Sequence, residues 1–159
     1  MTTNDLPPKP MSASRISLAQ LMQPENANVL GNVHGGWIMK LVDEAGALAC
    51  MRHSQRRVVT VTVDSMTFKL PIRTSDLVIL KAEVTFTGRT SMEAEVQVVA
   101  ENPITGERWD TNIAYLVYVA LDDDGKPTPV PSVFGETPEE EKKLAEARIR
   151  QARRLEEKK

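Results

Sequence analysis

The sequence predicts an α+β domain in which an antiparallel sheet wraps around one buried helix. Residues 35–52 contain no proline, and their apolar side chains go all the way round a helix, as in a helix buried on every side. Residues 57–121 then hold four segments with strand-like alternation or β-branched composition. No strand–helix–strand crossover and no internal repeat occurs, so the order favours an antiparallel sheet.

The elements before the helix are short. Residues 1–13 are polar and contain three prolines, so we expect a disordered lead-in. Residues 14–22 predict a first strand, and residues 23–28 are turn formers. In the helix itself, the run Ala45-Gly46-Ala47 would let another backbone approach closely. The main domain is expected to span residues 14–135.

The strands after the helix are separated by turn signals. Residues 57–68 are rich in β-branched side chains, and Pro71 follows them. Residues 77–87, 92–98 and 109–121 alternate, with turns expected at Gly88-Arg89 and at residues 102–106. One face of the sheet must bury the apolar helix, so the sheet has to wrap around it. This arrangement is the hotdog fold.

The last segment, residues 136–159, predicts a charged helix. Thr137 is a capping residue, Pro138 suits the first position, and acidic residues occupy the first turn. Its apolar residues, Leu144, Ile149 and Leu155, are sparse. We therefore expect the helix to be mostly solvated, with docking on a neighbouring subunit as the alternative.

Composition excludes several classes of function. A length of 159 residues suits one domain, and the net charge of −2 gives no basic field for nucleic acid or a membrane surface. A single cysteine, Cys50, rules out an internal disulfide, and two histidines are too few for a typical zinc centre. With no signal peptide and no membrane span in the sequence, we expect a cytoplasmic protein without a metal.

The chemistry is expected in the segment NANVLGNVHGGWIMKLVDEAGA, residues 26–47. Gly35 and Gly36 leave the first N–H groups of the helix open to a ligand, at the positive end of the helix dipole. Such groups can polarise a carbonyl and hold an oxyanion. The alternative is that these glycines only permit a tight turn into the helix.

Asp43 is a carboxylate in an otherwise apolar helix, where an ionised group is usually paired or functional. It can act as a general base on water or as a nucleophile. A structural ion pair with Lys40 is the alternative, and Glu44 competes for the catalytic role. Asn32, just before the glycines, can orient water or a carbonyl, or it can bond its own loop.

Weaker candidates lie nearby and at a hairpin. His34 can serve as a base, but a histidine at the start of a helix more often has a structural role. Cys50 and His53 are interpreted as packing residues. Arg89, Thr90 and Ser91 can bind phosphate through a cation and hydroxyl groups, with a solvated turn as the alternative.

These motifs resemble the acyl-CoA hydrolases of the hotdog superfamily, which include a cytosolic long-chain hydrolase and small bacterial relatives. The resemblance also covers VVTVTVDSMTFKLPI, FTGRTSMEAEV, TNIAYLVYVALDDDGKPTPVP and ETPEEEKK, which is most of the chain from about Ser14. It implies that Asn32 and Asp43 form the active site from opposite subunits, with Gly35 and Gly36 polarising the carbonyl. His34, Arg89, Thr90 and Ser91 are assigned to substrate binding.

The resemblance further implies an acyl-CoA thioesterase that releases fatty acid and coenzyme A without a cofactor. Because fused relatives carry two hotdog domains, this single domain is expected to form a homodimer, and a hexamer as a trimer of dimers. Two other functions remain open. A hotdog hydroxyacyl dehydratase would use His34 and Glu44, whereas a non-enzymatic acyl-CoA sensor would bind without turnover.

Overall fold

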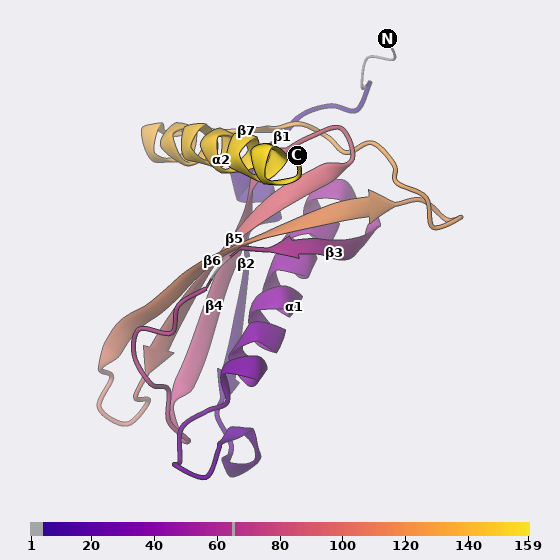
Figure 1. Cartoon of the computed structure of the whole chain (residues 1–159). Helices are drawn as coiled ribbons and strands as arrows, with labels where there is room; N and C mark the ends of the chain where they lie inside the picture. The colour runs from indigo at the N-terminus through magenta and orange to yellow at the C-terminus, as the bar shows by residue number, and fades with distance from the viewer. Residues whose placement is uncertain (1–4, 65) are drawn as a thin grey trace.

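The computed structural model describes residues 5–64 and 66–159 (Figure 1). Its helices are α1 (Gly35–Ser54) and α2 (Pro138–Glu157), with two short 3-10 turns at Met11–Ser14 and Pro24–Asn26. Its strands are β1 (Lys9–Pro10), β2 (Ile16–Leu21), β3 (Arg57–Val63), β4 (Leu77–Thr87), β5 (Ser91–Glu101), β6 (Arg108–Leu121) and β7 (Val133–Phe134).

The main sheet has five antiparallel strands in the order β2-β4-β5-β6-β3, and α1 runs along one of its faces (Figure 1). The predicted hotdog arrangement is therefore confirmed. The face toward α1 is built from alternate residues of the three inner strands, all nearly or fully buried: Val78, Leu80, Ala82, Val84, Met92, Ala94, Val96, Val98, Ala100, Ala114, Leu116, Tyr118 and Ala120.

The first residues differ from the expectation. Residues 1–4 lie outside the described residues, but Lys9–Pro10 pairs in parallel with Val133–Phe134, and the Met11 side chain is fully buried. The sequence predicted disorder for residues 1–13 because they are polar and rich in proline. Burial of Met11 and the pairing with β7 offset the conformational entropy lost when this segment is ordered. The segment from Lys9 onward is thus part of the fold.

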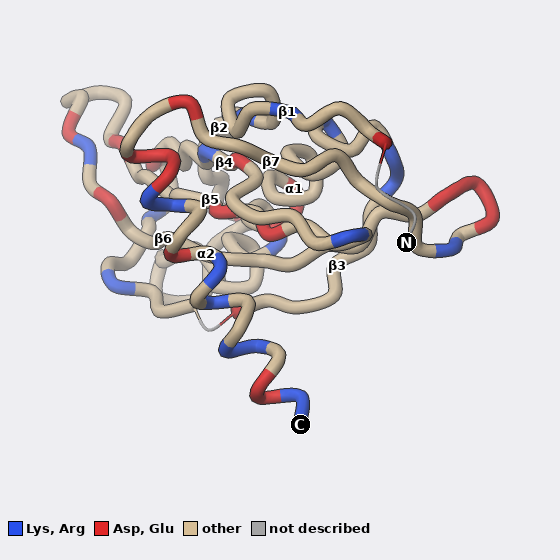
Figure 2. The backbone as a smooth tube through the Cα atoms, turned by 90° about the horizontal axis from the view of Figure 1, so that it is seen from above, with Lys and Arg blue, Asp and Glu red and all other residues tan. Residues whose placement is uncertain are grey.

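Most residues of the C-terminal helix α2 are exposed, as expected, but the helix also docks on the sheet of its own chain, which the sequence did not predict. Thr137 caps α2 as predicted, and Leu144 and Ala147 are buried residues of this helix. Lys143 binds Glu83 and Glu95 on the outer face of the sheet, opposite α1. Figure 2 shows acidic and basic positions interspersed along the chain toward the C-terminus. Charge complementarity with the sheet replaces the missing apolar stripe.

The strand expected at residues 57–68 ends at Val63, and residues 66–72 have no regular secondary structure. α1 extends slightly past its predicted end to Ser54, and Gln55 follows it in the left-handed region at φ 55°. His53 is buried, and its Nε2 lies 2.7 Å from the carbonyl oxygen of Pro131, which fits its predicted packing role. Neither helix within residues 5–64 and 66–159 has the length and apolar character of a membrane span.

Candidate active site

Asp43 lies half-buried on the side of α1 that faces β3 and β6. Its Oδ1 accepts a hydrogen bond from Thr60 Oγ1 at 2.8 Å and lies 3.0 Å from Tyr118 Oη. Tyr118 Oη is also 2.9 Å from the backbone oxygen of Asp43. Asp43 is therefore not held by the cation that a structural ion pair would need, but by two neutral hydroxyl groups.

The two hydroxyl donors come together through strand register. Thr60 on β3 is directly opposite Tyr118 on β6, so both side chains point toward α1. The register then shifts between Thr60 and Thr62, which leaves Val61 as an extra residue. Such a bulge re-aims the side chains that follow it. As a result Thr60 and Val63, three residues apart, line the same pocket.

A pocket of about 240 Å³ lies beside the carboxylate. Its wall is mainly apolar, with Lys40, Asp43, Thr60 and the start of α1 as the polar elements. The lining residues are Gly36, Met39, Lys40, Val42, Asp43, Thr60, Val63, Met66 and Leu116. A mostly apolar pocket with a few convergent polar groups is the usual form of a small-molecule site.

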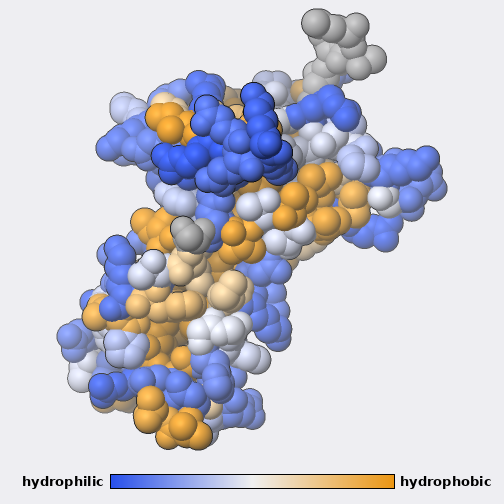
Figure 3. Space-filling view, viewed as in Figure 1, coloured by the Kyte–Doolittle hydropathy of each residue, from blue (hydrophilic) through white to orange (hydrophobic). Residues whose placement is uncertain are grey.

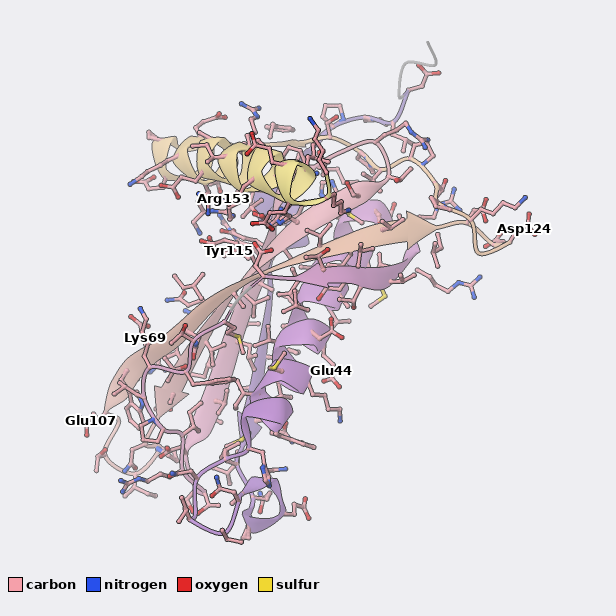
Figure 4. All side chains as sticks on the ribbon, viewed as in Figure 1. Glu44, Lys69, Glu107, Tyr115, Asp124 and Arg153 are labelled. Carbon is pink, nitrogen blue, oxygen red and sulfur yellow. The ribbon has the colours of Figure 1, made fainter. Side chains whose placement is uncertain are left out.

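Glu44, the rival carboxylate, points away from the sheet (Figure 4). Its side chain is 50% exposed, and Lys40 Nζ lies 3.8 Å from its Oε1. Exposed pairs of this kind contribute little to stability and leave the carboxylate in water. The structure therefore places Asp43, and not Glu44, in the pocket.

The start of α1 offers open backbone donors. His34 precedes the helix, and its carbonyl oxygen accepts hydrogen bonds from Trp37 and Ile38, whereas its side chain makes no capping bond. Within the described chain, no hydrogen bond engages the N–H of Gly35 or Gly36. A Cβ on Gly35 would lie 3.2 Å from the Phe68 ring, but one on Gly36 would meet nothing within 4 Å. Of these two glycines, Gly36 lines the pocket and Gly35 does not.

Two asparagines lie in the loop before α1. Asn32, the predicted site residue, is half-buried, and its side chain makes no hydrogen bond within residues 5–64 and 66–159. Asn28 Oδ1 accepts from the backbone N–H groups of Leu30 and Asn32, at 2.9 and 3.2 Å. This fixes the Asn28 side chain and leaves its NH₂ group as a preorganised donor. Neither asparagine lines the Asp43 pocket of its own chain.

The predicted phosphate-binding residues lie elsewhere. Arg89, Thr90 and Ser91 form the β4–β5 hairpin, far from the start of α1 in Figure 1. Backbone oxygens of Arg89 and Thr90 accept from Val130 and Ala120, which fixes the hairpin and leaves the Arg89 side chain exposed. A single chain does not bring these residues, or the exposed His34, into the Asp43 pocket.

Burial determines the protonation of two groups near α1. Desolvation raises the pKa of the Cys50 thiol, so this fully buried cysteine is a poor nucleophile. Desolvation, reinforced by the charge of Asp43, raises the pKa of Tyr118, so its hydroxyl stays protonated and remains a donor. No group of three His, Cys, Asp or Glu side chains that could hold a metal occurs in the described parts of the chain.

Sequence reasoning missed Thr60 and Tyr118. Both look like ordinary strand residues, because their roles depend on which strands pair and in which register. The nearest sequence signal is Gly46 in the helix. The small side chains there were expected to admit a backbone, but the group that approaches is the Tyr118 ring.

Residues 30–107 match the model of the thioesterase superfamily. An acyl-CoA thioester hydrolase of Salmonella typhimurium is 38% identical over 135 residues, which are 82% of this chain and 98% of the relative. This chain belongs to the thioesterase superfamily. Among these thioesterases, the cytosolic acyl coenzyme A thioester hydrolase of Rattus norvegicus is 37% identical over 145 residues. The match covers 90% of this chain but only 38% of that relative's length.

Solved thioesterase structures share the fold over almost the whole chain. An apo-hexameric acyl-CoA thioesterase superposes with a TM-score of 0.91 at 39% identity, covering 96% of this chain and 97% of the other. An acyl-CoA hydrolase of Staphylococcus aureus in complex with butyryl coenzyme A and coenzyme A superposes with a TM-score of 0.86 at 35% identity, covering 96% and 95%. Three variant structures of that hydrolase have an aspartate, an asparagine or a threonine replaced by alanine.

Proposed function

We propose that this thioesterase hydrolyses fatty acyl-CoA to free fatty acid and coenzyme A in the cytoplasm. The observation that supports this most directly is the Asp43 carboxylate, held by two hydroxyl groups at the edge of a mostly apolar pocket. An apolar wall suits an acyl chain, and a fixed carboxylate suits the activation of water. Membership of the superfamily and the names of its relatives support the same substrate class.

In the proposed reaction, Asp43 removes a proton from water as the water oxygen attacks the thioester carbonyl carbon. The oxyanion collapses, the C–S bond breaks, and the coenzyme A thiolate takes up the proton from Asp43. The products are the fatty acid and the free thiol. Direct attack by Asp43, followed by hydrolysis of the resulting anhydride, gives the same products. A single turnover in H₂¹⁸O detects direct attack when water opens the anhydride at the Asp43 carbonyl carbon, because the first product then carries an unlabelled Asp43 oxygen.

The first turn of α1 is the proposed oxyanion site. The free N–H of Gly36 and the positive end of the helix dipole favour a developing negative charge. Gly36 and Asp43 are seven residues apart on one side of α1, or about 10 Å along the axis. A thioester and its attacking water fit between them. Asn32 is proposed to reach this space from a second subunit, because it does not line the pocket of its own chain.

A second copy of the chain is proposed to pair with β3. This strand is at the edge of the sheet, and its Val59, Val61 and Val63 side chains are between 40% and 49% exposed. Figure 3 shows apolar surface in this region beside the hydrophilic surface of α2. An unpaired apolar edge strand is a template for strand pairing, and a two-fold dimer would close it. The hexameric thioesterase structures support a hexamer, and we propose that it is built as a trimer of such dimers.

The deciding experiment replaces Asp43 and its neighbour separately. Asp43→Asn keeps the size and the acceptor for Thr60 but removes the base, so kcat for palmitoyl-CoA should fall by about 100-fold or more. Glu44→Gln, an equal charge change one residue away, should keep kcat within about twofold because Glu44 is exposed. Free thiol is measured with a chromogenic disulfide. A folded Asp43→Asn protein with wild-type turnover would refute the proposal.

The same assay separates the rival functions. When a hydroxyacyl-CoA replaces palmitoyl-CoA, a dehydratase would release no thiol and would form an enoyl thioester with loss of water, whereas a sensor would bind acyl-CoA without turnover. The structure gives the dehydratase little support, since His34 is exposed and lies outside the pocket.

A further inference from the structure

Tyr118 is buried between the sheet and α1 at the point where α1 carries Asp43. Its side chain is 0% exposed, and Oη lies within hydrogen-bonding distance of both the backbone oxygen and Oδ1 of Asp43. Because β6 is an inner strand of the sheet, the Tyr118 Cα is fixed by pairing on both sides, to Met92 and to Thr60. The hydroxyl is thus a donor with a fixed position.

Gly46 gives the Tyr118 ring its room. A Cβ at Gly46 would lie 2.5 Å from Tyr118 Oη, which is closer than a Cβ atom approaches a non-bonded neighbour. Gly46 is in the middle of α1, where glycine costs about 1 kcal/mol relative to alanine. The helix therefore contains an intrinsically unfavourable residue at the one place where the tyrosine hydroxyl must reach Asp43.

The two oxygens of Asp43 differ in their surroundings. Oδ1 accepts from Thr60 and is within reach of Tyr118, whereas Oδ2 has no hydrogen-bond partner among the described residues. Donated hydrogen bonds draw charge from an oxygen and lower its basicity. Oδ2 is therefore the more basic oxygen, and it is the one left for a ligand.

We propose that Tyr118 is a positioning residue that engages Oδ1 of Asp43 and directs Oδ2 to the reacting atoms, in the space that Gly46 provides. This inference rests on the proposed thioesterase function. Tyr118 does not touch the substrate in this arrangement, and it acts only through the orientation of Asp43. Its high pKa keeps it a donor throughout the working pH range.

The test compares two tyrosines on the same strand. Tyr118→Phe removes the hydroxyl at Asp43, and Tyr115→Phe removes one on the opposite face, where Tyr115 Oη lies 3.3 Å from Glu95 Oε2 beneath α2 (Figure 4). Gly46→Ala is a third variant, which keeps the hydroxyl but displaces it. For each, kcat and KM with palmitoyl-CoA are measured between pH 5 and pH 9, together with Tm.

Tyr118→Phe should lower kcat by about 10- to 100-fold with KM nearly unchanged, because misplacing a catalytic group by about 1 Å has this effect. Gly46→Ala should lower kcat in the same way. Tyr115→Phe should change Tm but leave kcat and the pH profile unchanged.

Two results would overturn the inference. One is a Tyr118→Phe protein whose kcat matches that of Tyr115→Phe, which would make Tyr118 a packing residue only. The other is a Gly46→Ala protein with wild-type kcat. If Asp43→Asn is inactive in the same experiment, the proposed function stands although the inference fails. If Asp43→Asn is active, the function itself fails.

Discussion

The two loop asparagines differ in how their side chains are held. Asn28 Oδ1 is engaged by two backbone N–H groups, whereas the Asn32 side chain is unengaged in the described chain. If Asn32 binds the substrate as proposed, Asn32→Ala should lower kcat/KM by about 10-fold or more and leave Tm unchanged. Asn28→Ala, in contrast, should lower Tm, because two backbone donors lose their acceptor.

Kinetics and thermal melts on both variants check this prediction. A loss of activity with Asn28→Ala alone would transfer the role to the preorganised NH₂ group of Asn28.

His53 makes stability depend on pH. Burial lowers its pKa, reinforced by the charge of Lys9, and its Nδ1 has no hydrogen-bond partner among the described residues. A depressed pKa means that the unfolded state binds the proton more tightly. The contribution of neutral His53 to stability is therefore complete above about pH 6.5, the ordinary pKa of histidine, and it is lost as the pH falls through the lower pKa of the folded state.

We expect Tm to fall between pH 7.5 and pH 5.5, and to fall less in His53→Gln, measured by differential scanning fluorimetry. His34 is the only other histidine and is exposed, so His34→Gln should keep the wild-type pH dependence. An equal fall in all three proteins would assign the effect to carboxylates.

At the scale of elements, α2 is held to the sheet by buried charge. Glu93 is 0% exposed and accepts from Arg150 at 2.7 and 3.0 Å, and from Thr85 at 2.6 Å. Arg154 binds Glu93 as well and reaches Asp64 at 2.8 Å. Arg150 also stacks over the Tyr115 ring, 3.6 Å from its centroid. The guanidinium partners of the buried Glu93 are thus in place only when the helix is docked.

Removing one partner of this cluster leaves a buried charge partly unpaired. Arg154→Met should therefore cost about 3 kcal/mol of unfolding free energy. Arg153→Met, one residue away on the exposed side, should cost less than about 0.5 kcal/mol. Urea denaturation measures both. Equal costs would show that the ion pairs do not hold α2.

The sequence predicted α1 and the long strands well because their patterns are local. The helix has no proline, and alternation in residues 77–121 reports one buried face of a sheet. It predicted the start and the cap of α2 but not its docking, because Lys143, Arg150 and Arg154 look like solvated charges until Glu83, Glu93 and Glu95 are known to lie opposite them. It found Asp43 because a carboxylate is conspicuous in an apolar helix. Thr60 and Tyr118 were missed because register between distant strands has no local signature.

For the whole molecule, the exposed β3 edge predicts that assembly and activity are lost together. Val61 is 49% exposed on this edge and does not line the pocket, so Val61→Lys should weaken dimer formation without touching Asp43 directly. Light scattering after gel filtration should show smaller species, and kcat/KM should fall in proportion. Ile104 is in the turn between β5 and β6 and is 91% exposed, so Ile104→Lys should change neither the size of the assembly nor kcat/KM.

An active Val61→Lys monomer would contradict the shared site. It would show that one chain holds every group the reaction needs.

The extra residue at Val61 also makes the pairing of β3 a determinant of the ligand. Val63 is opposite Leu116 because β3 holds one residue more than β6 between this pair and the pair of Thr60 with Tyr118. If the same residues paired without the bulge, simple alternation would place Thr62 opposite Leu116 and turn Val63 away from the pocket. A hydroxyl group would then replace an apolar side chain on the wall beside the acyl group. The register of this strand is accordingly a route by which chain-length preference can change without any substitution in the catalytic helix.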